Sequence, residues 1–206
     1  MYKHPLIDRD KMSPKEALQI LIEGNQRFQN NLRSNQDNAK LINITKDAQH
    51  PFASVLSCSD SRAPVELIFD QAIGDIFSVR LAGNIASQNA IASLEFGLKY
   101  LKSKLLLVLG HSSCGAIKGC CDNVEDGLIT NLLHQISPCL ELETETQGNR
   151  NSSNIEFIEN VVELNVHYQK KKIIQDSEII RNLEKAGKIE IYTGVYDLAT
   201  GNVRIV

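Results

Sequence analysis

The stretch FASVLSCSDSR at residues 52–62 decides the fold of this chain. Its apolar run gives way to small polar residues, which is typical of a buried strand that stops at the carboxyl edge of a sheet. A thiol, a carboxylate and a guanidinium then alternate at Cys58, Asp60 and Arg62. Ligands and catalytic groups gather at that edge in open α/β sheets. The stretch therefore predicts a strand over 52–57 that ends in a functional site.

A second stretch, LLLVLGHSSCG at residues 105–115, has the same design. The strand predicted over 105–110 is followed by His111 and, three residues later, by Cys114. If the two strands are neighbours in one parallel sheet, Cys58, Asp60, His111 and Cys114 converge on one point. Two thiolates, an imidazole and a carboxylate are ligands that suit zinc.

The alternative interpretation is that Cys58 and Cys114 are small buried hydrophobic residues and that His111 is a core imidazole with satisfied hydrogen bonds. That interpretation does not explain why all three residues stand at strand ends beside glycine and serine, rather than inside the apolar runs. We therefore expect a metal site at this edge of the sheet.

Strands and helices alternate along the rest of the chain, which predicts an α/β domain with a mainly parallel sheet. A capping box at Ser13 marks the first helix. No internal repeat or linker divides residues 1–206, so we expect a single domain. Further strands are expected over 76–81, 189–196 and 202–206, the last one antiparallel. Helices are expected over 14–32, 63–69, 87–102, from 115, from 124 to Pro138, 155–171 and 176–186, with polar exposed residues over 144–153.

The 206 residues are 42% hydrophobic and 23% charged, with a net charge of −3, as in soluble globular domains. This balance gives no reason to expect a nucleic-acid partner. No apolar window approaches the roughly 18 residues of a membrane span, and the N-terminus lacks a signal-peptide pattern. Five cysteines, an odd number, do not make a disulfide framework. We expect a cytoplasmic protein whose thiols are free to bind a metal.

Arg62 bears on whether such a metal site is catalytic or structural. An arginine two residues after Asp60 can hold that carboxylate in a bidentate pair. Three protein ligands then remain, and a water molecule takes the fourth position of an open site. Zinc lowers the pKa of bound water to about 7, which supplies hydroxide near neutrality. If Asp60 instead swings onto the metal, the water is displaced and the site is silent.

At these residues the chain resembles the β-class carbonic anhydrases. The resemblance runs from the Ser13 helix through the motifs at 58–62 and 111–115 to the closing hairpin at 196–201. It implies reversible hydration of CO2 to bicarbonate and a proton by zinc-bound hydroxide. One Zn2+ per chain would be held by Cys58, His111 and Cys114. Asp60 and Arg62 would be the catalytic dyad that keeps the metal site open, with Asp60 as the fourth ligand of a closed state.

The resemblance also implies a fold and an assembly. The family fold has a parallel four-stranded core sheet with an antiparallel edge strand, surrounded by helices. Family members are homodimers or dimers of dimers, and the N-terminal helical arm, residues 1–35 here, would pack on a partner subunit.

A substrate pocket follows from the same resemblance. Gln49, nine residues before Cys58, matches a substrate-binding glutamine near the dimer interface. Phe77 matches an aromatic wall of the CO2 pocket, and Gly115 matches a backbone amide close to the substrate. Phe96 stands where several members have tyrosine, so the ring is kept and the hydroxyl is lost.

Three other functions fit parts of the pattern. The substrate can be a CO2 analogue such as carbon disulfide or carbonyl sulfide, which the shape of the channel decides. The zinc can be a structural staple in a closed four-ligand site. A thiol redox protein would need a Cys-x-x-Cys near a helix start, and no such spacing occurs. The remaining cysteines are interpreted as packing residues on helices: Cys120, Cys121 and Cys139.

Overall fold

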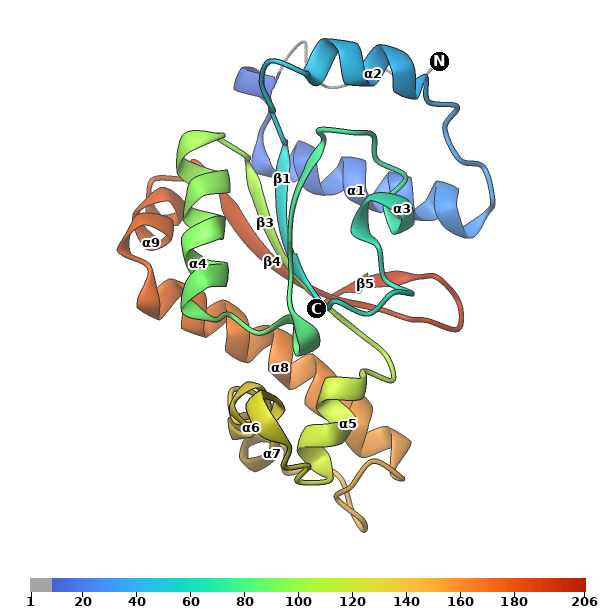
Figure 1. Ribbon diagram of the computed structural model, residues 1–206, viewed down its shortest axis with the longest axis vertical. Coiled ribbons are helices and arrows are strands. Elements are labelled where there is room, and N and C mark those ends of the chain that lie inside the picture. Colours follow the sequence, from blue (N-terminus) through green and yellow to red (C-terminus); the bar gives the residue numbers. More distant parts are fainter. Residues whose placement is uncertain (1–8) are drawn as a thin grey trace.

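The structure of the protein, a computed structural model, describes residues 9–206 (Figure 1). Five strands form one sheet in the order β2-β1-β3-β4-β5. The first four strands are parallel, and only β5 runs antiparallel to its neighbour. The α/β class and the antiparallel closing strand are therefore confirmed. The strands are β1 (Ala53–Ser57), β2 (Ile76–Arg80), β3 (Leu105–His111), β4 (Glu190–Tyr196) and β5 (Val203–Ile205).

Helices cover both faces of the sheet (Figure 1). On one face lie α1 (Pro14–Gln29) and α3 (Val65–Ile68), and on the other lie α4 (Gln88–Glu95), α8 (Ile155–Asp176) and α9 (Glu178–Lys185). Three short helices, α5 (Gly115–Cys121), α6 (Gly127–Leu133) and α7 (Pro138–Leu142), gather at the end of the sheet toward which β3 runs. The helix α2 (Asn38–Thr45) lies at the opposite end.

Each strand divides its side chains between two apolar cores because successive residues of a strand point to opposite faces. Val55 and Leu107 belong to the core shared with α1 and α3. Leu56 and Val108 belong to the core shared with α4 and α8. Every residue of β1 and β3 is buried, as expected for parallel strands covered on both faces.

The start of α1 is the predicted capping box. The Ser13 side chain accepts a hydrogen bond from the backbone N–H of Glu16, and the Glu16 carboxylate accepts one from the backbone N–H of Ser13 at 2.7 Å. Two residues of this helix, Ala17 and Leu21, are fully buried against the chain's own sheet. The described part of the N-terminal arm thus packs on its own domain through this face of α1.

Several helix boundaries differ from those predicted. The first helix ends at Gln29 rather than near 32, and Asn31 has a φ of +53°. The helix expected over 87–102 is α-helical only to Glu95 and continues as a π-helical turn, Phe96–Tyr100. Pro138 begins α7 instead of ending a helix, because proline fits the first turn, where its missing N–H is not needed.

The sequence analysis also missed one helix and ended another too early. The short helix α2 was not expected; it is capped by Asp37, whose carboxylate accepts a hydrogen bond from the N–H of Lys40. The long helix expected to end at 171 continues as α8 to Asp176. In the segment expected to be exposed, Thr146 is buried together with the neighbouring Glu143. Within residues 9–206, no helix is both long and apolar enough to cross a membrane.

Candidate metal centre

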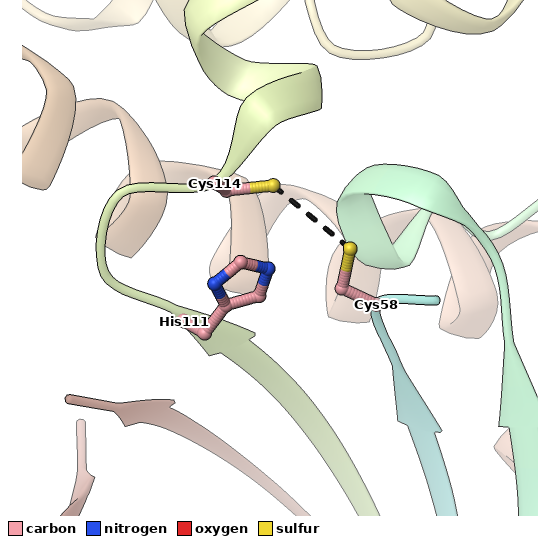
Figure 2. A group of neighbouring side chains, drawn as sticks. All are labelled: Cys58, His111 and Cys114. Atoms are coloured by element: carbon pink, nitrogen blue, oxygen red, sulfur yellow. Dashed lines mark hydrogen bonds between the residues drawn. The ribbon is translucent and has the colours of Figure 1, made fainter. Parts of the chain in front are cut away.

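The predicted convergence of the two strand ends is confirmed. In the parallel pair β1 and β3, Ser57 lies opposite Leu109, so both strands end at the same edge of the sheet. Cys58 follows β1 directly, His111 is the last residue of β3, and Cys114 is the residue before α5. Their donor atoms lie within 4.8 Å of one another, and all three residues are buried (Figure 2).

The geometry of the three donors fits a tetrahedral zinc ion. The two Sγ atoms are 4.0 Å apart, close to the roughly 3.8 Å expected for two sulfurs each about 2.3 Å from a tetrahedral zinc. His111 Nδ1 lies 2.9 Å from the backbone carbonyl of Ser112. Because a carbonyl only accepts, Nδ1 carries the proton and the Nε2 lone pair is free.

His111 Nε2 supplies an independent sign that something is bound there. It is buried without a hydrogen-bond partner in the described part of the chain. A buried polar atom with no partner is costly, whereas a lone pair directed at a metal is satisfied. Two thiols and an imidazole are the donor set of many zinc sites. Residues 9–206 contain no second cluster of this kind.

Each of the two thiols shifts the pKa of the other. The hydrogen bond from the Cys114 thiol lowers the pKa of Cys58 to about 4, while the same contact, together with burial, raises the pKa of Cys114. The two shifts have opposite signs because the sulfur atoms share one proton. Burial lowers the pKa of His111, but its contacts with Cys58 outweigh burial and leave that pKa above its ordinary value.

Two groups outside the predicted ligand set also hold Cys58. The backbone N–H of Gly83 donates a hydrogen bond to Cys58 Sγ at 3.3 Å. Arg80, at the end of β2, donates to the carbonyl oxygens of Cys58 at 3.0 Å and of Asp60 at 2.6 Å. The arginine thus fixes the backbone that carries both the thiol and the carboxylate.

The predicted pair of Asp60 and Arg62 is confirmed as bidentate. Arg62 Nε donates to one carboxylate oxygen at 3.0 Å, and a terminal guanidinium nitrogen donates to the other at 2.8 Å. The backbone N–H of Arg62 adds a third hydrogen bond at 2.9 Å. Arg62's hydrogen bonds hold the pKa of Asp60 well below its usual range. The carboxylate lies 3.8 Å from His111 Nε2, beside the metal donors but bound to the arginine.

The other predicted pocket residues divide into two groups. Gly115 begins α5 next to Cys114 and is exposed, and a Cβ added to it would meet no atom within 4 Å. Open space therefore lies beside its backbone at the metal donors. Gln49 precedes β1 and is exposed, so it lies toward the opposite edge of its own sheet.

Phe77 and Phe96 also lie away from the donors of their own chain. Phe77 is opposite Ser54 in the β1–β2 pair. Cys58 is four residues after Ser54, which is roughly 13 Å away at the rise per residue of a strand. The Phe77 and Phe96 rings pack on each other with centroids 6.2 Å apart. Within one chain, these two rings are neighbours of each other and not of the metal donors.

The packing role expected of the remaining cysteines agrees with their burial. All five cysteines are buried and free. Burial raises the pKa of Cys120 to about 11 and the pKa values of Cys121 and Cys139 to about 12. These thiols stay protonated near neutrality, and none belongs to the donor cluster.

The sequence analysis missed two polar residues of α8, Asn165 and Gln169, which reach the turn beside Cys58. Asn165 donates to the carbonyl of Gly83 at 3.0 Å, and Gln169 accepts from the N–H of Ala86 at 2.8 Å. The signal was present in the sequence: two amides one helical turn apart interrupt the apolar stripe of Val162, Val166 and Ile173.

Comparison with known proteins gives consistent matches. The family profile described as carbonic anhydrase matches residues 53–203. A carbonic anhydrase of Mycolicibacterium smegmatis is 34% identical over 137 residues, 63% of this chain and 66% of that protein. Carbonic anhydrase 2 of Mycobacterium tuberculosis is 29% identical over 92% of this chain and 91% of its own length. The solved structure of the β-carbonic anhydrase CcaA has a TM-score of 0.72 at 28% identity, covering 91% of this chain and 94% of its own.

Proposed function

We propose that this chain, which belongs to the β class of the carbonic anhydrase family, hydrates CO2 reversibly with one zinc ion held by Cys58, His111 and Cys114. The observation that carries the choice of metal and ligands is the buried set of two sulfurs and one unpartnered imidazole nitrogen. When bound there, zinc would supply hydroxide near neutral pH by lowering the pKa of water.

The protein's own groups divide the work. Both thiols must be deprotonated to bind zinc, and the Gly83 N–H supports the charge on Cys58. Asp60 accepts three hydrogen bonds from Arg62, which hold its carboxylate off the metal donors. Asp60 would accept a hydrogen bond from a water bound at the site and orient that water toward CO2. The open space beside the Gly115 backbone would leave room for a substrate oxygen next to the donors.

Asp60 also has a second position. Its carboxylate is 3.8 Å from His111 Nε2, so a rotation away from Arg62 brings it to the metal donors. Arg62 is the group that opposes this rotation. Its side chain is 58% exposed, so it can change its conformation more freely than a buried side chain could. The open state of the site depends on this one exposed ion pair.

The first test is the rate of CO2 hydration between about pH 6.5 and about pH 9, on protein assayed for zinc. We expect fast hydration with one zinc per chain. Cys114→Ser should lose the zinc and fall to the rate of buffer. The matched control is Cys121→Ser, which removes a buried thiol outside the donor set and should keep both zinc and activity.

Two outcomes would contradict the proposal. If zinc is bound and CO2 hydration is no faster than buffer, while carbon disulfide or carbonyl sulfide is hydrolysed, the substrate is the analogue. If no substrate reacts and X-ray absorption finds no light-atom water ligand on the zinc, the metal is structural.

We also propose that the protein is a homo-oligomer, a dimer or a dimer of dimers. β2 is an edge strand, and an open edge invites pairing with another chain. Large apolar side chains are exposed near it: Phe96 is 46% and Tyr100 is 64% exposed. The helix α2 exposes Ile42 and Ile44 in the same way. A second copy of the chain would bury such surfaces.

Assembly would bring the distant pocket residues of one subunit to the metal centre of another. Gln49, Phe77 and Phe96 lie away from the donors of their own chain, so they would line the site of a partner subunit. The outer face of the 1–35 arm is then free to pack on that partner. Light scattering of Phe96→Glu against the unaltered protein tests this. We expect a smaller assembly with a weakened CO2 affinity, and an unchanged mass would contradict it.

For localisation we propose a reducing compartment, the cytoplasm. All five cysteines are free, including the two metal donors, and oxidising compartments favour disulfides. Fractionation of cells that express the full chain tests this, and recovery outside the cytoplasm would contradict it.

A further inference from the structure

The turn beside the metal donors has an unusual backbone. In the 3₁₀ turn Ala82–Asn84, Gly83 has a φ of +67° and Asn84 a φ of +45°. A Cβ on Gly83 would lie 2.6 Å from Ile136 Cδ1, so only glycine fits this position without displacing the core. Successive left-handed residues are uncommon and persist where the surroundings impose them. This conformation directs the Gly83 N–H at Cys58 Sγ.

Two side chains from α8 impose it. Asn165 donates through Nδ2 to the carbonyl of Gly83 at 3.0 Å. Gln169 accepts from the N–H of Ala86 at 2.8 Å, just after the turn. Gln169 also donates to Asn165 Oδ1 at 2.9 Å, which fixes the direction of the asparagine amide. The two amides are bonded to each other, and together they hold the backbone at Gly83 and at Ala86.

These amides are too buried to be explained as ordinary surface residues. Asn165 and Gln169 are both 0% exposed, inside the core between α8 and the sheet. Burying two primary amides carries a desolvation cost that apolar side chains avoid. Such networks fix one arrangement of the groups they bind when every member is satisfied. The arrangement fixed here is the backbone of Gly83: its carbonyl accepts from Asn165, and its N–H, which belongs to the preceding peptide group, donates to the Cys58 sulfur.

We propose that Asn165 and Gln169 are positioning residues for the metal-binding thiolate of Cys58. They hold the Gly83 carbonyl and the backbone that follows it, which keeps Gly83 in the left-handed conformation that directs its N–H at the sulfur. That hydrogen bond spreads the thiolate charge and orients the sulfur lone pairs. Groups of this kind, one step removed from the metal, tune its affinity. The proposal rests on the metal-binding role given to Cys58 in the proposed function, and it does not depend on the identity of the substrate.

The test is metal affinity, measured by chelator competition with Zn2+ in the absence of any substrate. Asn165→Leu should weaken zinc binding by about 10-fold or more. In the Co2+-loaded protein, losing a hydrogen bond to sulfur raises the energy of the sulfur lone pairs. The thiolate-to-cobalt charge-transfer band should therefore move to longer wavelength. Both readouts can be taken whether or not the protein hydrates CO2, so this proposal and the proposed function fail separately.

Gln169→Met is the second variant, since Asn165→Leu can prevent folding. It leaves Asn165 in place and removes the donor that orients it, the acceptor for Ala86 and a hydrogen bond to the carbonyl of Gln135. We expect the same changes at smaller size. The matched control is Asn160→Ala on the same helix, which loses hydrogen bonds to Glu143 and Thr146 instead. That variant should lower thermal stability and leave the zinc affinity and the cobalt band unchanged.

Two results would overturn the proposal. One is zinc affinity and a cobalt band in the folded Asn165 or Gln169 variant equal to those of the unaltered protein. The other is an equal loss of affinity in Asn160→Ala, which would mean that any weakening of α8 loosens the site.

Discussion

Two arginine–carboxylate pairs in this protein differ in their surroundings. Asp60 pairs with Arg62 at the end of β1, and Glu143 pairs with Arg150 after α7. The Glu143 side chain is 1% exposed, whereas Asp60 is 15% exposed and its arginine is 58% exposed. One carboxylate is enclosed by the fold, and the other stands at the mouth of the candidate metal centre.

The number of competing partners separates the pairs further. Glu143 accepts hydrogen bonds from Thr146, Asn160 and Glu145 as well as from Arg150. Arg150 also bonds to two backbone carbonyls and lies over the Phe157 ring at 4.6 Å. Within residues 9–206, the Asp60 carboxylate accepts hydrogen bonds from Arg62 alone. A carboxylate with many donors is locked, and one with a single exposed donor can change partner.

The largest effect that separates the pairs should come from Arg62→Ala. Asp60 would then be free to reach the metal, and CO2 hydration should fall by about 100-fold, as when a preorganised charged group is removed from an active site. Zinc content and melting temperature should stay near those of the unaltered protein. Stopped-flow rates on zinc-assayed samples measure this, with Arg62→Lys as a partial replacement. Full activity in Arg62→Ala would refute the role given to this arginine.

The second effect should be one of stability. Arg150→Ala removes three hydrogen bonds and leaves the buried Glu143 carboxylate short of one donor. We expect a loss of about 1 to 3 kcal/mol in the free energy of unfolding, discounted because the Arg150 side chain is 40% exposed. The activity per zinc should change by less than about two-fold.

Urea unfolding measures the effect, and Arg204→Ala is its matched control. The Arg204–Glu163 pair is exposed on both sides, at 59% and 41%. Its removal should therefore cost well under about 1 kcal/mol. Equal losses of unfolding free energy in the two variants would show that the burial of Glu143 adds nothing to the stability that its ion pair contributes.

The smallest effect concerns pH. Burial raises the pKa of Glu143, but hydrogen bonds from Thr146, Arg150 and Asn160 outweigh it and lower that pKa to about 2 from an ordinary 4.5. A depressed carboxyl pKa contributes stability above pH 4.5, and that contribution is lost as the pH falls toward 2. Metal-free protein should thus lose stability on acidification less steeply in Glu143→Gln than in the unaltered chain. Unfolding curves at several acidic pH values, with chelator present, would contradict this if the two slopes coincide.

The sequence was most informative where a structure forms among near neighbours. The Ser13 cap and the Asp60–Arg62 pair join residues three and two positions apart, so their spacing alone predicts the contact. The cluster of Cys58, His111 and Cys114 was predictable because parallel strands end at the same edge of a sheet. These three residues stand at or just after the ends of two such strands. Boundaries were less predictable: α7 starts at Pro138, where a helix was expected to end.

Other contacts between distant segments were not predicted from the chain. Asn165 reaches Gly83 across 82 positions, and Gly83 reaches Cys58 across 25. The polar segment 144–153 was expected to be exposed, yet Thr146 is buried in it, where it donates a hydrogen bond to the buried carboxylate of Glu143.

By itself the sequence determined the α/β class, the candidate donors Cys58, His111 and Cys114, and the Asp60–Arg62 pair, because these follow from local periodicity, from short spacings and from the points where two buried strands end. Only the tertiary structure decided which groups surround those donors. The burial of His111 Nε2, the direction of the Gly83 N–H and the enclosure of Glu143 each require a specific packing of elements far apart in the chain. Such packing is selected by shape and by the satisfaction of buried polar groups.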